Sequence, residues 1–488
     1  MDDNGKKLAE AFREIELFVF DCSAIVNMKD LDIVGEITDA ILQNFCKVLV
    51  TQEFYSDYEV IVKSLNEFQK AAAQAVSVFL KRLSENNCLL NLSEYLNARD
   101  MVLKLHRNPK VCFVYYINSE CAEAIVEFGE TLAAKAVTID EEGNYAFGEK
   151  REDILANSVR EIDRAAIDDD FFAVSSIPGQ GMEVKTREGE VYSLGKLIGS
   201  GGEGSVYEID REGYVIKIYN RGQLNQLRLK KLAVMERRQV EYAGICWPEK
   251  MVFSSMGEPV GYLMKRAGGK ALSSIFECDD AVLKAFPNWK KKDLVLLAID
   301  ILQKIQYLHL LGILVGDLRM HNIVIDGNGM ASLVDIDSCQ IGNLPCPTGF
   351  PDFTPPELLH QEFKKKLRTF QNESFSCAVL MFKILFCGLH PYDQRHGADT
   401  IEEEIASRSF PYPEEAGGDY SRIPWGGYES MWRCTPHQFQ SFLYNIFKKG
   451  VTYSVQEMIA MLKVYDQFLT LKEGDFPYSN QITFQYES

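Results

Sequence analysis

The chain has 488 residues, 46% of them hydrophobic and 25% charged, which accommodates two or three domains with cores of their own. Its formal net charge of −18 argues against general binding to polyanions, and twelve cysteines without a Cys-x-x-Cys pair argue against disulfides or a zinc site. No apolar run approaches the roughly 18 residues of a membrane span and MDDNGKKLAE has no signal-peptide core, so we expect a cytoplasmic location and no membrane partner.

The first 175 residues alternate short apolar strands with longer helical stretches. The strands read LFVFD, KVLVT and VCFVYYI, and they begin at residues 17, 47 and 111. This alternation predicts an α/β domain built on a parallel sheet with crossover helices. An acidic run followed by Ser, Pro and Gly (IDDDFFAVSSIPGQG) then indicates a linker, which we place at residues 176–189.

Carboxylates lie near the ends of the elements in this first domain. Asp21 ends the first strand, Glu53 and Asp57 follow the second, and Asp100 lies on a helix before the third. Carboxylates at one edge of a parallel sheet can hold a divalent metal for phosphodiester hydrolysis, which would make RNA a partner. If the domain is such a nuclease, we expect Asp21, Asp57 and Asp100 to converge. If the acids are only helix caps and solvated groups, the domain is an α/β interaction module.

Glycine-punctuated strands after the linker predict a β-rich lobe. GSGGEGSV places Gly199, Gly201 and Gly204 in a G-x-G-x-x-G spacing, followed by Val206. Glycine lets the backbone approach phosphate oxygens and present its N–H groups to them. SVYEI and YVIKIY have the pattern of a hairpin rather than the strand and helix of a dinucleotide fold, and the second strand carries Lys217 as a candidate partner of the ATP phosphates.

Two further residues complete the expected nucleotide site. A lysine that binds phosphate needs a carboxylate to hold it, and Glu236, in the helical stretch LAVMERRQ, is our candidate. Met264 ends the apolar part of the strand PVGYLMK, where a hinge would place it near the adenine.

The stretch ILVGDLRMHNIVID carries the acid and the amide of a phosphotransfer loop. Asp317 is placed to accept or orient the acceptor hydroxyl, Arg319 to supply a cation near the γ-phosphate, and Asn322 to bind a metal. Asp335 follows at the end of an apolar strand, where it can bridge Mg²⁺ or Mn²⁺ to the β- and γ-phosphates. The order and spacing of these residues predict phosphate transfer from ATP.

From about residue 190 to about residue 465 the chain resembles the eukaryotic-type protein kinases. TPPELL resembles the end of their activation segment, and NESFSCAVLMFKILFCGLHPYD resembles the next helix, with Glu373 where an Asp is usual. GDL followed by VDIDSCQI is similar to a bacterial branch of these kinases, often associated with tellurite-resistance-type gene clusters. The resemblance implies a bilobal α+β fold, ATP and Mg²⁺ or Mn²⁺ as cofactors, and a protein Ser/Thr substrate. It also implies these boundaries: domain 190–470, small lobe 190–264, large lobe 270–470, tail 471–488.

Two departures from the kinase pattern bear on activation. Val315 and Gly316 stand where His-Arg is usual, so the arginine that would clamp a phosphorylated activation segment is absent, and we expect activity that does not depend on phosphorylation. Asp337 stands where a Gly is usual, which we expect to stiffen the metal-binding turn. Neither departure removes a group that touches ATP or the metal, so we expect an active enzyme.

Two other functions fit the same motifs. GDL and VDID also resemble the aminoglycoside and choline phosphotransferases, although the complete glycine loop and PPELL favour a protein substrate. The second is a pseudokinase scaffold combined with a nuclease. Residues 14–140 resemble a PIN-type nuclease domain, although Ile117-Asn118-Ser119 replaces the usual Thr-Asn-Asp.

We expect the first domain to select or regulate a target, on a linker that lets it swing over the cleft or hold a substrate at high effective concentration. We also expect that removal of residues 1–175 leaves transfer to a generic substrate but loses transfer to the physiological one. The sequence leaves open the physiological substrate, the activation trigger and the oligomeric state.

Overall fold

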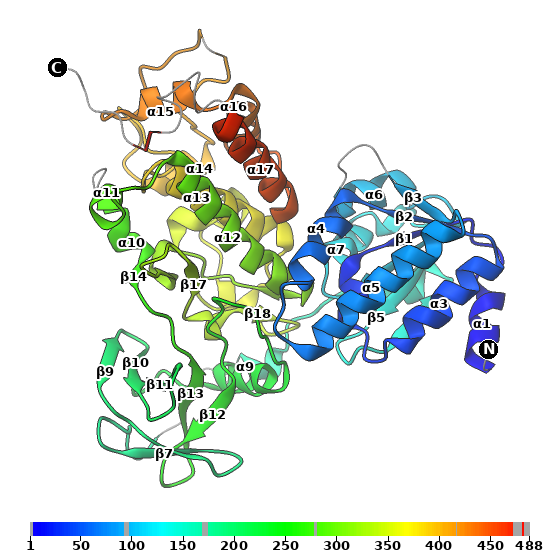
Figure 1. Ribbon diagram of the computed structural model, residues 1–488, viewed down its shortest axis with the longest axis horizontal. Coiled ribbons are helices and arrows are strands. Elements are labelled where there is room, and N and C mark those ends of the chain that lie inside the picture. Colours follow the sequence, from blue (N-terminus) through cyan, green and yellow to red (C-terminus); the bar gives the residue numbers. More distant parts are fainter. Residues whose placement is uncertain are drawn as a thin grey trace.

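The computed structural model describes residues 3–91, 97–167, 174–277, 281–415, 417–471 and 481–482. The chain forms an N-terminal domain and a two-lobed domain that lie side by side (Figure 1). Within the described ranges, every helix is too short or too polar to cross a membrane. The cysteines in these ranges are free thiols, and nearly all of them are buried.

The N-terminal domain is built on one sheet with the strand order β3-β2-β1-β4-β5-β6. The first five strands pair in parallel and β6 is antiparallel to β5, so the expected parallel sheet is confirmed. Helices cover both faces, which is why β4 is an unbroken apolar run that is buried at every position. The strands are β1 (Leu17–Phe20), β2 (Lys47–Val50), β3 (Leu89–Asn91), β4 (Val111–Tyr116), β5 (Lys135–Ile139) and β6 (Tyr145–Gly148).

Polar side chains begin several helices of this domain. Asp21 and Thr51 each follow a strand and accept a backbone N–H from the first turn of the next helix, and Asn66 and Asn97 do the same within loops. The helices are α1 (Asp3–Ala11), α2 (Cys22–Asn27), α3 (Asp32–Gln43), α4 (Gln52–Ile61), α5 (Glu67–Glu85), α6 (Ala98–Leu105), α7 (Glu120–Glu127) and α8 (Arg151–Ser158).

The small lobe is an antiparallel sheet with the order β8-β7-β12-β13-β11-β10-β9, accompanied by one helix, α9 (Gln226–Arg237). β7 lies inside the interval 176–189 that the sequence assigned to a linker, so the sheet begins earlier than expected. The interval reads as a linker because β7 alternates exposed and buried residues over only four positions. The strands are β7 (Glu183–Thr186), β8 (Val191–Ser193), β9 (Leu197–Ser200), β10 (Gly204–Glu208), β11 (Tyr214–Tyr219), β12 (Lys250–Phe253) and β13 (Pro259–Lys265).

The large lobe is mostly helical, and its centre is formed by α12 and α13, which are buried along most of their lengths. Short strands carry the loops that face the small lobe: β14 (Lys270–Ala271), β15 (Ile313–Leu314), β16 (Ile323–Ile325), β17 (Ala331–Leu333) and β18 (Gln340–Ile341). The helices are α10 (Leu272–Ile275), α11 (Ala281–Ala285), α12 (Lys291–Leu310), α13 (Phe370–Leu385), α14 (Ile401–Ala406), α15 (Tyr428–Cys434), α16 (His437–Tyr444) and α17 (Val455–Leu471).

The N-terminal domain is fixed to the large lobe through α4, which packs against α12 and α17. The Asp57 carboxylate on α4 accepts hydrogen bonds from the Nε2 atoms of Gln306 (2.7 Å) and Gln456 (2.9 Å), which lie on α12 and α17. The Tyr307 hydroxyl is buried beside Ser64 Oγ at 3.1 Å. Buried apolar side chains of both domains form one continuous cluster. The expected swinging motion is therefore wrong, because it would break a buried interface.

The same domain also contacts the segment that follows α9. Arg238 Nη2 donates to Asn27 Oδ1 (2.9 Å), and the Leu65 N–H donates to the Glu241 carbonyl (2.8 Å). Ser64 Oγ donates to the same carbonyl at 3.3 Å. The N-terminal domain therefore holds the connection between α9 and the rest of the small lobe.

Candidate active site

The glycine loop joins β9 to β10 and covers the cleft between the lobes. Gly204 needs to be glycine for packing, because a Cβ atom there would lie 2.5 Å from the Ile218 carbonyl oxygen. At Gly199 and Gly201, by contrast, an added Cβ would meet no atom within 4 Å. These two glycines border open space, as the approach of phosphate groups requires. Asn220 Nδ2 holds the loop by donating to the Gly201 carbonyl at 2.9 Å.

Lys217 lies on β11 directly opposite Val206, and its ammonium group points into the cleft. Its Nζ is 3.0 Å from Asp335 Oδ1 and 2.9 Å from Asp337 Oδ1. Burial opposes the charged form of Lys217, but Asp337 and Asp335 outweigh it and raise the pKa of the ammonium group above its usual value. The expected phosphate-binding lysine is therefore held in its charged form. Met264 on β13 is buried and pairs with Val215, next to the lysine strand.

Glu236 does not hold Lys217, and this expectation is wrong. It lies in the last turn of α9, where its Oε1 accepts the Met251 N–H of β12 at 3.0 Å and its Oε2 lies 4.0 Å from Arg187. The charged side chains that α9 directs toward Lys217 and its partners are cations: Arg228, and Lys231, whose Nζ donates to the Ser338 carbonyl at 2.7 Å. The sequence interpretation assigned a carboxylate to α9 by spacing alone, and spacing does not decide which helix face meets the cleft.

Asp337 is the side chain around which this charged cluster is organised. It accepts hydrogen bonds from the hydroxyls of Tyr219 (2.7 Å) and Tyr262 (2.9 Å) in addition to the bond from Lys217, and Arg228 Nε lies 3.6 Å from its second oxygen. Burial opposes its charge, but Lys217 and Arg228 lower the pKa of the Asp337 carboxyl below its usual value. Asp337 is therefore a buried, fully paired anion.

The catalytic loop brings Asp317, Arg319 and Asn322 together. Asn322 Nδ2 is 3.0 Å from the Asp317 carbonyl and 3.3 Å from its Oδ2, and Arg319 Nη2 lies 3.3 Å from the same Oδ2. Burial raises the pKa of Asp317 above its usual value, although Arg319 and Asn322 act in the opposite direction. Glu373 on α13 supports the loop by accepting the Val315 and Gly316 N–H groups at 2.8 and 2.6 Å.

Asp335 stands at the mouth of the cleft in a left-handed backbone conformation, with φ of 53°. The Val334 N–H donates to the Asn322 carbonyl at 2.9 Å, which places Asp335 beside Asn322. The Asp335 side chain is 49% exposed, so a ligand can reach its free oxygen. Carboxylate and amide oxygens are the donors that Mg²⁺ prefers, and phosphate oxygens complete its coordination in kinases. The residues present therefore fit the metal that the sequence predicts.

A guanidinium group lies next to Gly316 that the sequence interpretation did not anticipate. A Cβ atom at Gly316 would lie 2.4 Å from Arg368 Nη1, so Arg368 fills the room where the usual arginine side chain would begin. Arg368 Nη2 donates to the Thr348 carbonyl of the activation segment. Because Arg368 precedes α13, no signal near the catalytic loop could have indicated it.

Comparison with known proteins agrees with this geometry. The model for the protein kinase domain matches residues 192–452, which is more than half of the chain. The chain belongs to the protein kinase family. It is 31% identical to protein kinase YegI of Escherichia coli K12 over 249 residues, which are 48% of this chain and 38% of YegI.

Two further relatives are more distant. The chain is 26% identical to the rat serine/threonine-protein kinase MRCK beta over 212 residues, 40% of this chain and 12% of that protein. It is 30% identical to the vaccinia virus (Western Reserve) B1 kinase over 146 residues, 27% of this chain and 46% of that protein. The match therefore spans less than half of each relative.

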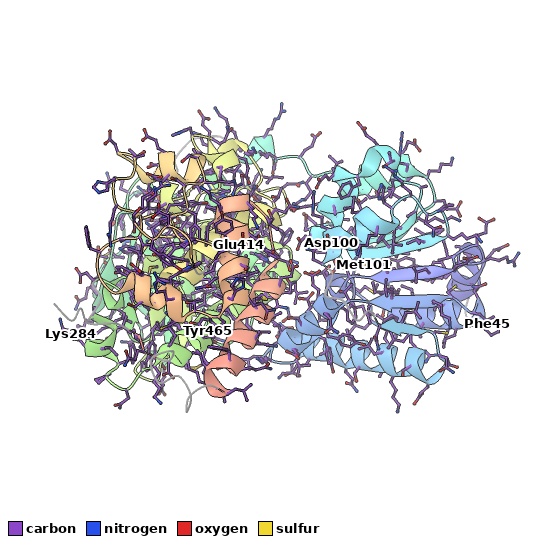
Figure 2. The ribbon with its side chains drawn as sticks, turned by 90° about the horizontal axis from the view of Figure 1, so that it is seen from above. Phe45, Asp100, Met101, Lys284, Glu414 and Tyr465 are labelled. Atoms are coloured by element: carbon purple, nitrogen blue, oxygen red, sulfur yellow. The ribbon has the colours of Figure 1, made fainter. Side chains whose placement is uncertain are left out.

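The acids of the N-terminal domain lie outside the residues that the kinase model matches. Asp21, Glu53 and Asp57 line one pocket, whereas Asp100 does not line it. No group of three or more His, Cys, Asp or Glu side chains within the described ranges is arranged to hold a metal ion. The expected metal trio is therefore wrong. Figure 2 shows Asp100 and Met101 on the side of this domain that faces the two lobes, and Phe45 at its far end.

These acids have other partners instead. Asp21 caps α2 through the Ser23 N–H (2.9 Å), Glu53 Oε2 accepts the Ala98 N–H (2.7 Å), and Asp57 binds the two glutamines of the interface. Burial raises the pKa of Asp57 to about 7. Their positions favour the interaction module over the nuclease.

Proposed function

We propose that the chain is a Ser/Thr protein kinase that uses ATP with Mg²⁺ or Mn²⁺. The observation that carries this proposal is the meeting of Lys217, Asp335, Asn322 and Asp317 beneath a glycine loop whose open side can receive phosphates. A scaffold that only binds partners has no chemical need for all of these groups. The kinase family match and the YegI relative support the same reaction class.

Each residue has one role in this mechanism. Lys217 binds the α- and β-phosphates, and N–H groups of the glycine loop bind the remaining phosphate oxygens. Asp317 orients the acceptor hydroxyl and accepts its proton, while Arg319 places a positive charge beside the transferred group. A metal held by Asp335 and Asn322 would neutralise charge between the phosphates.

An aliphatic hydroxyl is the acceptor that we propose. The activation segment leads into Pro355 and Pro356 and forms a platform for a peptide, which a small-molecule phosphotransferase does not need. Phe350 is exposed on this segment and packs against Arg319, with the guanidinium carbon 5.1 Å from the ring centre. The rat relative is named a serine/threonine-protein kinase, which supports the same acceptor class.

For the N-terminal domain we propose a fixed regulatory role. It forms hydrogen bonds with the Glu241 carbonyl and the Arg238 side chain, which directly follow α9. The same helix carries Arg228 into the active site. A binding event on this domain that shifts its contacts with Glu241 and Arg238 would therefore reach the nucleotide site through α9. We do not propose a nuclease.

Labelled ATP with Mg²⁺ tests the kinase proposal. The full-length chain is incubated alone, with generic protein acceptors and with a cell lysate, and modified residues are identified by mass spectrometry. We expect phosphoserine and phosphothreonine in the acceptors and none with Asp317→Ala, which removes the group that orients the hydroxyl but leaves the ATP contacts. Equal labelling by Asp317→Ala would refute the assignment, and labelling of aminoglycosides or choline alone would support the small-molecule alternative.

A further inference from the structure

The feature that carries this inference is the carboxylate beside Lys217. In the arrangement that the sequence led us to expect, a carboxylate on the helix of the small lobe holds this lysine. Here the acidic residue of α9 is Glu236, which lies two turns beyond Arg228 in the last turn of the helix and is engaged by the Met251 N–H. The groups within ion-pair distance of Lys217 are instead Asp335, Asp337 and Glu203.

We propose that Asp337 is the positioning residue of Lys217, and that Arg228 holds Asp337 in place from α9. This inference rests on the proposed kinase function and adds to it. The carboxylate that holds Lys217 then comes from the segment that carries Asp335, and not from α9 as we expected from the sequence.

Asp337 is the most firmly held of the three acidic neighbours. Its side chain is only 1% exposed, and both oxygens are engaged, Oδ1 by Lys217 and Tyr262 and Oδ2 by Tyr219 and Arg228. Two aromatic rings flank the ammonium group of Lys217, since its Nζ lies 5.5 and 5.8 Å from the centres of the Tyr219 and Tyr262 rings. A carboxylate that accepts three hydrogen bonds and forms an ion pair with Arg228 cannot rotate without leaving one of these groups unpaired, so it fixes the lysine.

The two other acids are suited to different tasks. Asp335 is half-exposed and has a free oxygen for a metal, so its carboxylate would be shared between Lys217 and the metal. Glu203 belongs to the glycine loop, is 41% exposed, and reaches Lys217 at 3.8 Å and Arg228 at 2.9 Å. A phosphate group can displace such an exposed carboxylate, whereas Asp337 stays in place.

This arrangement ties three parts of the active site to one side chain. Lys217 comes from β11, Arg228 from α9, and Asp337 from the turn Ile336–Ser338 that follows Asp335. A shift of α9 therefore acts on the lysine through Arg228 and Asp337, and the same shift acts on the metal-binding segment. Nucleotide and metal sites are coupled through a buried anion.

The variant Asp337→Asn tests the assignment, because it keeps the shape and the hydrogen-bond acceptor but removes the charge. We expect KM for ATP to rise about tenfold and kcat to fall, with KM for the protein acceptor unchanged, since only the phosphate-binding lysine loses its partner. The matched control is Glu404→Gln on α14, which neutralises another buried carboxylate, one that accepts the Ala398 N–H in the large lobe. It should lower thermal stability and leave KM for ATP unchanged.

Nucleotide titration by calorimetry provides a second measurement that does not need transfer activity. Asp337→Asn should weaken ATP binding in the wild-type background and cause no further loss in Lys217→Met, because the residue acts through the lysine. If Asp337→Asn does not fold, Arg228→Met decides, with an expected loss in ATP affinity of roughly threefold. Unchanged ATP affinity in a folded Asp337→Asn or in Arg228→Met overturns the inference, as does an equal loss in the Lys217→Met background. A wild-type chain that binds ATP but transfers no phosphate would refute only the proposed function.

Discussion

Asp57 offers a test of the interface between the two domains. Its carboxylate is fully buried, and burial raises the pKa from 3.8 to about 7 despite the hydrogen bonds from Gln306 and Gln456. A carboxyl whose pKa is higher in the folded state favours folding only when protonated, so its penalty is absent well below pH 3.8 and complete above pH 7. Replacing it with asparagine keeps an Oδ1 acceptor for both glutamines and removes the charge. Asp57→Asn should therefore stabilise the chain, and more so at high pH.

The size of the pKa shift of Asp57 determines how much stability the substitution should add. At pH 8 it corresponds to a penalty of at most about 4 kcal/mol, and at pH 5 to about 2 kcal/mol, because each pKa unit is worth about 1.36 kcal/mol. The free energy of unfolding of Asp57→Asn minus that of the wild type should therefore increase by about 2 kcal/mol between pH 5 and pH 8.

Urea denaturation at both pH values, with and without a chelator, measures this difference. The matched control is Glu59→Gln on the same helix, whose carboxylate pairs with Lys463 of α17 at 2.9 Å but is 59% exposed. An exposed pair of this kind contributes about 0.2–1 kcal/mol, so the control should change little between pH 5 and pH 8. If Asp57→Asn is less stable than the wild type and the loss of stability grows with pH, the carboxylate is needed in its charged form and the reasoning is refuted. The same conclusion follows if a chelator lowers the stability of the wild type to that of Asp57→Asn.

Three further predictions follow from the same contacts. Lys217→Met should abolish phosphate transfer with an unchanged circular dichroism spectrum, and transfer at the wild-type rate would contradict the site. Thr354 Oγ1 donates to the Phe350 carbonyl at 2.8 Å, so Thr354→Ala should lower stability by about 1 kcal/mol in a thermal melt, and Thr354→Glu should not restore it. Deletion of residues 1–175 should yield an aggregated or inactive kinase domain, because it exposes Tyr307 and its apolar neighbours; a monodisperse, active fragment in size-exclusion chromatography would contradict the fixed interface.

The sequence predicted the elements of the site better than it predicted their partners. Glycine spacing and strand alternation are local signals, and they placed Gly199 to Gly204, Lys217 and the catalytic loop on the elements where the structure has them. The partner of Lys217 depends on which face of α9 meets the cleft, which a short helix with charges on several faces does not reveal. Asp337, the second acid of VDIDS, was identified in the sequence. We expected it to stiffen the metal-binding turn and did not predict that it would form an ion pair.

The contact between the two domains could not be predicted from the sequence, for a different reason. An amphipathic helix such as α4 shows that one face is buried, but its periodicity is the same whether the cover belongs to its own domain or to another. Acids such as Asp57 lie on that face, and isolated acids are expected in water. The glutamines that donate hydrogen bonds to Asp57 lie on α12 and α17, and no local sequence pattern connects them to it.

The bond between Asp57 and Gln456 joins side chains that are 399 positions apart in the chain. At synthesis rates of 5–20 residues per second, a ribosome needs about 20 to 80 s to pass from one to the other. Until α12 has been synthesised, α4 is exposed to water, where its carboxylates have ordinary pKa values and remain ionised. The charges that oppose burial in the finished protein would thus keep this face hydrated early in synthesis, and the face is covered first by α12 and fully only when α17 arrives.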